Sequence, residues 1–263
     1  TVTAGFFLAT PTTTNATIAL LNVLAGALLS CSGAGALNQY LERDTDGTMN
    51  RTQFRPLPQH KVSPVAVLAA GSALSLLGIV YLAVNVNLLT AAIDVLILAS
   101  YLFLYTPMKR LSPFSTLVGA VPGALPPVMG WTAATSSLDA GAMSLFAILF
   151  LWQIPHFLAI GTMYQEDYDR AGFPLLASDS AARGRQMSLY AAALVPVSLW
   201  PTLSGLAGSF YFWSAALLGM GFLAFCLGAK LNPSKAAARR VLLASVAYLP
   251  LLFMAMLFDR IAT

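Results

Sequence analysis

The sequence has few charged residues. Of its 263 residues, only 9% are Asp, Glu, Lys or Arg, with 14 basic and 10 acidic side chains, whereas a soluble domain carries about 25%. So few charges cannot cover a water-facing surface, which excludes a disordered chain, a nucleic-acid-binding domain and an ordinary soluble enzyme. With 58% hydrophobic residues and a mean hydropathy of +0.75, the composition indicates an integral membrane protein.

Cysteine is also scarce. Cys31 and Cys226 both lie inside apolar runs, and two isolated cysteines support neither a disulfide framework nor a cysteine-based metal site. We interpret both as small core residues. Residues 1–11 lack a basic segment and a cleavage site, so this apolar stretch is interpreted as the last half of a helix and not as a signal peptide.

Long apolar runs, by contrast, are abundant. A bilayer core about 30 Å thick requires about 20 apolar residues in each helix. Eight runs meet or approach this length, at residues 17–41, 63–85, 88–108, 113–131, 141–165, 187–207, 209–230 and 239–259. Together with the half-helix at residues 1–9, they predict a single all-α domain with nine transmembrane helices.

The basic residues are distributed unevenly among the loops between these runs. Cytoplasmic loops of membrane proteins collect Lys and Arg. Thirteen basic residues fall in four alternate loops: Arg43, Arg51, Arg55 and Lys61; Lys109 and Arg110; Arg170, Arg183 and Arg185; Lys230, Lys235, Arg239 and Arg240. Only Arg260 falls on the other side. This alternation predicts an N-terminus inside and a C-terminus outside.

Three oxygen-bearing side chains follow one another at the end of the second helix. Asn38, Glu42 and Asp46 are spaced i, i+4 and i+8, which places them along one helical stripe with about 6 Å of rise between neighbours. Magnesium is usually bound by one or two carboxylates together with substrate phosphates, and the nearby Arg51 and Arg55 can fork onto phosphate oxygens. The pattern favours a metal-bound diphosphate; the alternative is a helix end with local ion pairs.

A second acidic segment follows the sixth helix. At 100° per residue, His156, Tyr164 and Asp167 fall on nearly the same face and Asp169 points away, so Asp167 is the better candidate ligand. His156 lies roughly 16 Å deeper by the helical rise. An ionisable group at that depth is a functional candidate, and a histidine hydrogen-bonded to a neighbouring carbonyl is the alternative.

The two acidic segments are followed by similar sequences. Residues 51–57 (RTQFRPL) resemble residues 170–175 (RAGFPL), which predicts two pseudo-repeated four-helix units, roughly 17–131 and 141–259. Between the acidic segments, Lys109 and Arg110 end a helix on the same side of the membrane. They are candidate diphosphate ligands, although the general enrichment of basic residues on that side explains them equally well.

Proline and glycine are concentrated in one predicted helix. Residues 119–131 contain Pro122, Pro126 and Pro127 together with three glycines. We therefore expect this helix to be irregular, and irregular backbone at membrane depth is tolerated where it borders a cavity.

Taken together, these features resemble the UbiA superfamily of intramembrane prenyltransferases. The resemblance covers nearly the whole chain and is carried by residues 38–46, 49–58, 105–110, 119–131, 152–157 and 166–174. The first superfamily motif, Asn-x-x-x-Asp-x-x-x-Asp, is matched by Asn38, Glu42 and Asp46, with Glu in the middle place. Of the second Asp-rich motif, Asp167 is the clearest member. Residues 152–157 (WQIPHF) are similar to the branch of the superfamily that prenylates heme.

The resemblance implies a nine-helix bundle around a central cavity and a defined reaction. A farnesyl group would pass from farnesyl diphosphate to a vinyl group of heme B with addition of water, giving heme O and diphosphate. The implied roles are Mg²⁺ binding by Asn38, Glu42, Asp46 and Asp167, diphosphate binding by Arg51, Arg55, Lys109 and Arg110, stabilisation of the allylic cation by Tyr105 or Tyr164, and heme binding by His156.

The resemblance also implies a place in the cell. The active site would face the cytoplasm at a bacterial plasma membrane or the matrix at a mitochondrial inner membrane, with heme A synthase as a candidate partner and no role for nucleic acid. Two alternatives stay open: a prenyltransferase that acts on a quinone precursor, and a secondary transporter, since transporters also contain repeats and intramembrane acids.

Overall fold

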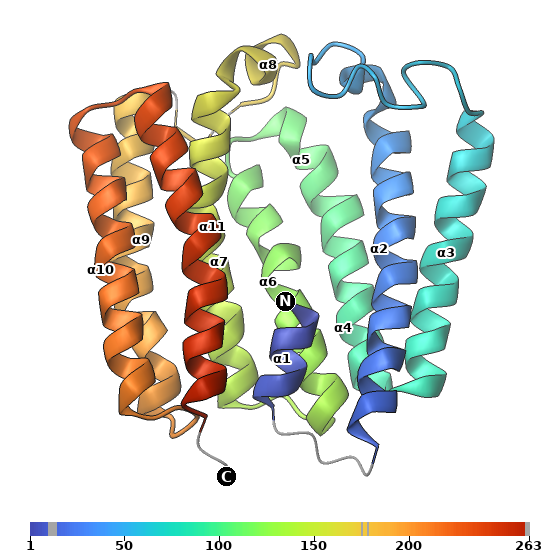
Figure 1. Ribbon diagram of the computed structural model, residues 1–263. Helices are drawn as coiled ribbons and strands as arrows, with labels where there is room; N and C mark the ends of the chain where they lie inside the picture. Colours follow the sequence, from blue (N-terminus) through green and yellow to red (C-terminus); the bar gives the residue numbers. More distant parts are fainter. Residues whose placement is uncertain (10–14, 175, 178, 261–263) are drawn as a thin grey trace.

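The chain forms a bundle of antiparallel helices (Figure 1). The computed structural model describes residues 1–9, 15–174, 176–177 and 179–260. Its helices are α1 (Val2–Leu8), α2 (Ala16–Asp46), α3 (Pro64–Asn85), α4 (Leu88–Ala99), the π-helical turn η1 (Ser100–Tyr105), α5 (Thr106–Leu111), α6 (Ser115–Thr135), α7 (Ala140–Met163), α8 (Gln165–Arg170), α9 (Ser180–Leu203), α10 (Ser209–Leu231) and α11 (Lys235–Phe258). The described residues include no β-strand.

Most of these helices are suited to crossing a membrane. Among the described residues, seven helical segments are long and apolar enough: α2, α3, the continuous Leu88–Leu111 segment, α6, α7, α10 and α11. The 24-residue α9 runs alongside them, and α1 covers only part of the bundle's height (Figure 1). The seven candidate spans confirm the predicted all-α membrane bundle, and the number of nine transmembrane helices stays a prediction. Thr10 and Pro11, predicted to follow the first helix, lie outside the described residues.

α2 extends beyond its apolar run to Asp46, so the whole acidic stripe is helical, as its spacing predicted. The predicted start of another helix is wrong. α9 begins at Ser180, seven residues earlier than its apolar run, because the Asp179 carboxylate caps it by accepting from the backbone nitrogen of Ala182 at 2.6 Å. Arg183 and Arg185 therefore belong to a helix and not to a loop. The cysteine prediction is confirmed for Cys226, which is buried, and is wrong for Cys31, which is exposed.

The irregular backbone occurs in a different helix from the one predicted. α6 is continuous despite its three prolines, whereas η1 interrupts the segment between α4 and α5. Pro107 lacks a backbone N–H, and its ring would clash with the carbonyl four residues earlier in a regular helix. A π turn before the proline relieves this clash, and the Thr106 hydroxyl donates to the carbonyl oxygen of Tyr101 at 2.8 Å.

Small residues allow α2 and α3 to pack closely. Gly26 and Gly33 of α2 face Leu82 and Ser75 of α3, and a Cβ atom at Gly33 would lie 2.6 Å from the backbone nitrogen of Ser75. Small side chains at such contacts let helix backbones approach each other inside a membrane. Because the acidic stripe lies on α2, this contact fixes the helix that carries it.

We predict that Gly33→Ala lowers the free energy of unfolding by roughly 1–3 kcal/mol, because the added methyl group forces the two backbones apart. Gly35→Ala is the matched control: it lies on the same helix, and its Cβ would meet nothing within 4 Å. Thermal unfolding in detergent measures both variants, and equal melting temperatures would contradict this account of the α2–α3 contact.

Candidate active site

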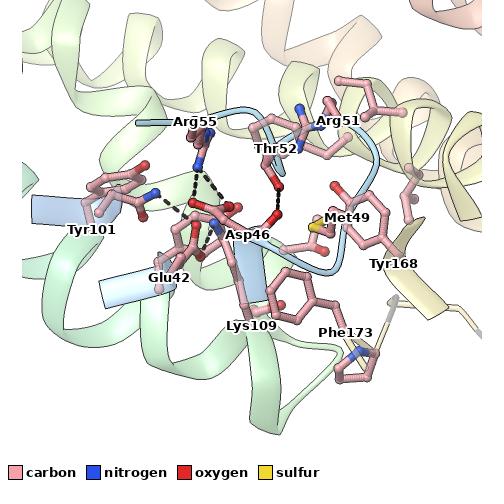
Figure 2. A pocket seen from close by; sticks show the side chains of 18 residues that line it. Glu42, Asp46, Met49, Arg51, Thr52, Arg55, Tyr101, Lys109, Tyr168 and Phe173 are labelled. Atoms are coloured by element: carbon pink, nitrogen blue, oxygen red, sulfur yellow. Dashed lines mark hydrogen bonds and ion pairs between the residues drawn. The ribbon is translucent and has the colours of Figure 1, made fainter. Parts of the chain in front are cut away.

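The acidic stripe of α2 lines a pocket of about 270 Å³ at the end of the bundle that carries α8 (Figures 1 and 2). Asn38, Glu42 and Asp46 are all buried, with 6%, 6% and 3% of their surface exposed. The Asn38 amide nitrogen donates to Glu42 Oε2 at 2.9 Å. The Thr106 hydroxyl, whose one proton is shared with the carbonyl oxygen of Tyr101, lies 3.1 Å from Asn38 Oδ1. Asn38 therefore orients Glu42, and the predicted single face of the stripe is confirmed.

Each carboxylate of the stripe is paired with a cation from another segment (Figure 2). Lys109 Nζ lies 2.7 Å from Glu42 Oε1, and Arg55 Nη1 lies 3.0 and 2.8 Å from the two oxygens of Asp46. Arg51 also lines the pocket. Arg110 lies outside the lining residues, and its guanidinium donates to the hydroxyl of Thr45 at 3.0 Å. The structure thus brings three of the four predicted diphosphate ligands to the pocket.

The segment after α2 folds back over the stripe and forms one wall of the pocket. The Thr52 hydroxyl donates to the carbonyl oxygen of Asp46 at 2.9 Å. Thr52 and Met49 are 4% and 3% exposed, and both line the pocket. This fold-back carries Arg51 and Arg55 to the carboxylates, although they follow the helix by five and nine residues.

Another wall comes from α8 and the turn that follows it. Tyr168, Phe173 and Pro174 line the pocket. Asp167 is buried but forms an ion pair with Arg170 and lies outside the lining residues. Among the described residues, no group of three His, Cys, Asp or Glu side chains is placed to hold a metal ion.

The prediction that His156, Tyr164 and Asp167 share one helical face is wrong. α7 ends at Met163, and Tyr164 has φ −112° and ψ 27°, so α8 starts in a new direction. Tyr164 is 42% exposed and lies outside the lining residues of the pocket. Tyr168, which was not predicted as a site residue, lines the pocket. A count of 100° per residue holds only within one continuous helix.

A second, mostly apolar cavity of about 640 Å³ adjoins the first and shares Tyr101, Tyr105, Lys109 and Phe157 with it. The Tyr105 ring lies 4.6 Å from Lys109 Nζ, between the two spaces. A Cβ at Gly119 would lie 2.5 Å from that ring, so this glycine makes room for it. α6 borders the cavity as predicted, through Gly119, Pro122, Gly123, Pro126 and Met129.

His156 faces α11. Its Nδ1 lies 2.8 Å from the hydroxyl of Ser245, and its ring stacks on Trp152 at 5.0 Å. Trp152 in turn donates to the carbonyl oxygen of Ser245 at 2.9 Å. His156 lies outside the lining residues of both spaces. His156 is therefore hydrogen-bonded, as in the alternative, but to a hydroxyl and not to a carbonyl. Heme binding by His156 stays a prediction.

Arg183 is a residue that sequence reasoning missed. It is 1% exposed, and its guanidinium contacts Thr162, Gln165 and Ala177. The sequence predicted Arg183 as one of several basic loop residues on one side of the membrane. The available signal was the N-cap residue Asp179, which marks the helix start four residues earlier.

An all-helical membrane bundle with a pocket of paired acids and bases opening onto an apolar cavity has the architecture of an intramembrane enzyme for substrates with an anionic head and an apolar tail. The model of the UbiA prenyltransferase family matches residues 1–257. The chain belongs to this family and is an integral, multi-pass membrane protein.

Curated relatives support the same family. The chain is 50% identical over 244 residues to the protoheme IX farnesyltransferase of Solibacter usitatus, covering 92% of this chain and 84% of that protein. It is 45% identical to the protoheme IX farnesyltransferase of Sorangium cellulosum, covering 89% and 85%. It is 42% identical to that of Myxococcus xanthus, covering 99% and 89%.

Solved structures share the fold at low sequence identity. A digeranylgeranylglyceryl phosphate synthase superposes with a TM-score of 0.83 at 15% identity, covering 98% of this chain and 91% of that one. A UbiA homolog from Archaeoglobus fulgidus bound to GPP and Mg²⁺ gives a TM-score of 0.67 at 15% identity, covering 97% and 93%.

We predict that Lys109→Met lowers the free energy of unfolding by about 2–4 kcal/mol, because it leaves Glu42 buried without a cation. Adding Glu42→Gln to this variant should restore part of the loss. Denaturant unfolding in detergent measures both.

The matched control for this pair is Lys235→Met. Lys235 and Glu166 are also 2.7 Å apart, but their side chains are 66% and 80% exposed. Lys235 lowers the pKa of Glu166 through its hydrogen bond and charge, yet a solvated pair contributes little to stability. If Lys235→Met lowered the free energy of unfolding as much as Lys109→Met, burial would not explain the stability that the Lys109–Glu42 pair contributes.

Proposed function

We propose that this chain transfers a farnesyl group from farnesyl diphosphate to a vinyl group of heme B, with addition of water, giving heme O and diphosphate. The observation that carries the proposal is the buried stripe of Glu42 and Asp46, each paired with a cation, next to an apolar cavity of about 640 Å³. Identity of 42–50% to proteins named protoheme IX farnesyltransferase supports heme as the acceptor.

The donor set of the pocket fits magnesium. Glu42 and Asp46 are two carboxylates on one stripe, and Mg²⁺ is commonly held by one or two carboxylates together with substrate phosphates and water. Asn38 keeps Glu42 in place through its amide. When bound, Mg²⁺ supplies Lewis-acid stabilisation of the negative charge on the departing diphosphate. Asp167 would join this site only on release from Arg170.

The basic residues of the pocket would bind the leaving group. Breaking the bond between farnesyl C1 and oxygen leaves its electron pair on diphosphate, and preplaced cations stabilise charge that develops in this way. Arg51, Arg55 and Lys109 line the pocket and supply such cations. Lys109 and Arg55 would exchange part of their contact with the carboxylates for contact with phosphate oxygens.

Tyr105 occupies the position where the farnesyl cation would form. It lines both the polar pocket and the apolar cavity, and the face of an aromatic ring attracts a cation. The vinyl carbon of heme B would bond to farnesyl C1, which moves the positive charge to the carbon next to the macrocycle. Water would then bond to that carbon and lose a proton, which completes the hydroxyethylfarnesyl group.

We also propose that the pocket faces the cytoplasm or the matrix. Lys61, Arg51 and Arg55 lie in the segment after α2, and Lys109 and Arg110 end α5 at the same end of the bundle. Enrichment of Lys and Arg marks this side.

The two pseudo-repeated units remain a proposal that rests on the similar sequences after the two acidic segments. Leu175, in the second of these sequences, lies outside the described residues. A heme A synthase partner also remains a proposal.

The reaction is tested by product mass spectrometry. Purified protein with labelled farnesyl diphosphate and Mg²⁺ should convert heme B to heme O and leave 4-hydroxybenzoate unchanged. Prenylation of the benzoate alone would favour the quinone-precursor alternative. A transporter would move its substrate without releasing diphosphate.

We predict that Asp46→Ala lowers the rate of diphosphate release by about 100-fold or more, because it removes a carboxylate from the site of charge development. Chelation by EDTA should abolish release, and added Mg²⁺ should restore it. Asp44→Ala is the control, since the Asp44 side chain is 77% exposed and off the stripe. Unchanged release in both Asp46→Ala and Asp167→Ala would refute the metal site.

The heme role of His156 has its own test. If its ring binds heme iron, His156→Ala should abolish the change in heme absorbance that the wild type produces on binding. Ser245→Ala should strengthen binding, because it frees Nδ1 from its partner. An unchanged spectrum in His156→Ala would remove the residue from the heme site.

A further inference from the structure

Arg183 is a buried charge in the first turn of α9. Arg183 is 1% exposed, and its side chain is among the largest fully buried ones of the described residues. Helix formation does not require it there, since Asp179 already caps the helix. A cation near a helix N-terminus is also opposed by the helix dipole.

Arg183 is held by hydrogen bonds, and the carboxylates of Asp179 and Asp169 attract its charge from beyond ion-pair distance. None of the ion pairs among the described residues includes Arg183. Burying a charge without a partner of opposite sign is costly unless its donors are satisfied. A side chain held at this cost contributes something that an apolar residue of the same size would not.

The guanidinium joins three separate segments. Its Nε donates to the hydroxyl of Thr162 at 3.1 Å, at the end of α7. Nη2 donates to Oε1 of Gln165 at 2.7 Å, at the start of α8. Nη1 donates to the carbonyl oxygen of Ala177 at 3.1 Å, beyond the turn that follows α8. The planar fork of an arginine suits this bridging.

These three anchor points enclose one wall of the pocket. The chain between Thr162 and Ala177 contains the break at Tyr164, the whole of α8 and the turn that carries Phe173 and Pro174. Tyr168 and Phe173 contact each other with ring centroids 6.3 Å apart, and both line the pocket. Arg183 itself lies outside the lining residues, so it acts on this wall only through its anchors.

We propose that Arg183 is a positioning residue that holds α8 and its following turn against the diphosphate pocket. This inference rests on the proposed function for the identity of the substrate. Loss of the guanidinium would release both ends of the wall together, because one group fixes Gln165 and Ala177 to α7. Binding of the prenyl diphosphate would weaken, whereas binding of the acceptor would change little.

The test compares Arg183→Met with Arg185→Met. Both arginines lie in the first turns of α9, but Arg185 is exposed. Arg183→Met should raise KM for farnesyl diphosphate about tenfold, as expected for a shift of the wall by a fraction of an ångström to about 1 Å. KM for heme B should stay within twofold of wild type, and Arg185→Met should match wild type in both. An equal rise in both KM values would overturn the proposal.

Two milder variants keep the test informative if Arg183→Met does not fold. Gln165→Leu and Thr162→Val each remove one anchor and keep the charge. Each should raise KM for farnesyl diphosphate, and their effects should be smaller than additive with Arg183→Met because they act through one group. A lower melting temperature with unchanged KM in all three would make Arg183 merely structural and overturn the proposal.

Two further measurements separate this proposal from the function on which it rests. Binding of radiolabelled farnesyl diphosphate needs no acceptor, so weaker binding by Arg183→Met supports the positioning role even if wild type makes no heme O. Tryptic cleavage after Arg170, whose side chain is 46% exposed, should be faster in Arg183→Met than in Arg185→Met. Equal cleavage together with equal binding would overturn the proposal.

Discussion

The site depends on the pairing of buried carboxylates with cations from other parts of the chain. Glu42 and Asp46 are each less than 7% exposed, and a charge in such a place is tolerated only with a partner. Glu42 takes Lys109, which lies 67 residues later, and Asp46 takes Arg55 from the segment that folds back over α2. The same pairs that stabilise the pocket therefore bring together the acids and bases that diphosphate chemistry requires.

The helical frame around these pairs is arranged to keep the polar end and the apolar cavity in contact. The π turn before Pro107 sets the direction of the segment that carries Tyr105 and Lys109. Gly119 of α6 leaves room for the Tyr105 ring. As a result one aromatic ring lies at the junction, with a cation on one side and the cavity on the other. In the proposed reaction this junction is where the allylic bond breaks.

The second wall of the pocket is held in a different way. It comes from α8 and the turn that follows it and not from a membrane-spanning helix. Arg183 ties the start of α8 and the residues after the turn to the end of α7. Asp167 is paired locally with Arg170, so α8 carries an acid that is buried beside the pocket without lining it.

The sequence by itself determined the membrane class, the all-helical fold and the single stripe of Asn38, Glu42 and Asp46. These features depend on composition and on spacing within one helix, which are local properties. The tertiary structure alone decided that Lys109 enters the pocket while its neighbour Arg110 bonds to Thr45, that His156 faces Ser245, and that Tyr168 replaces Tyr164. Each of these outcomes depends on which helix packs alongside or on the dihedral angles of one residue, and spacing along the chain carries neither.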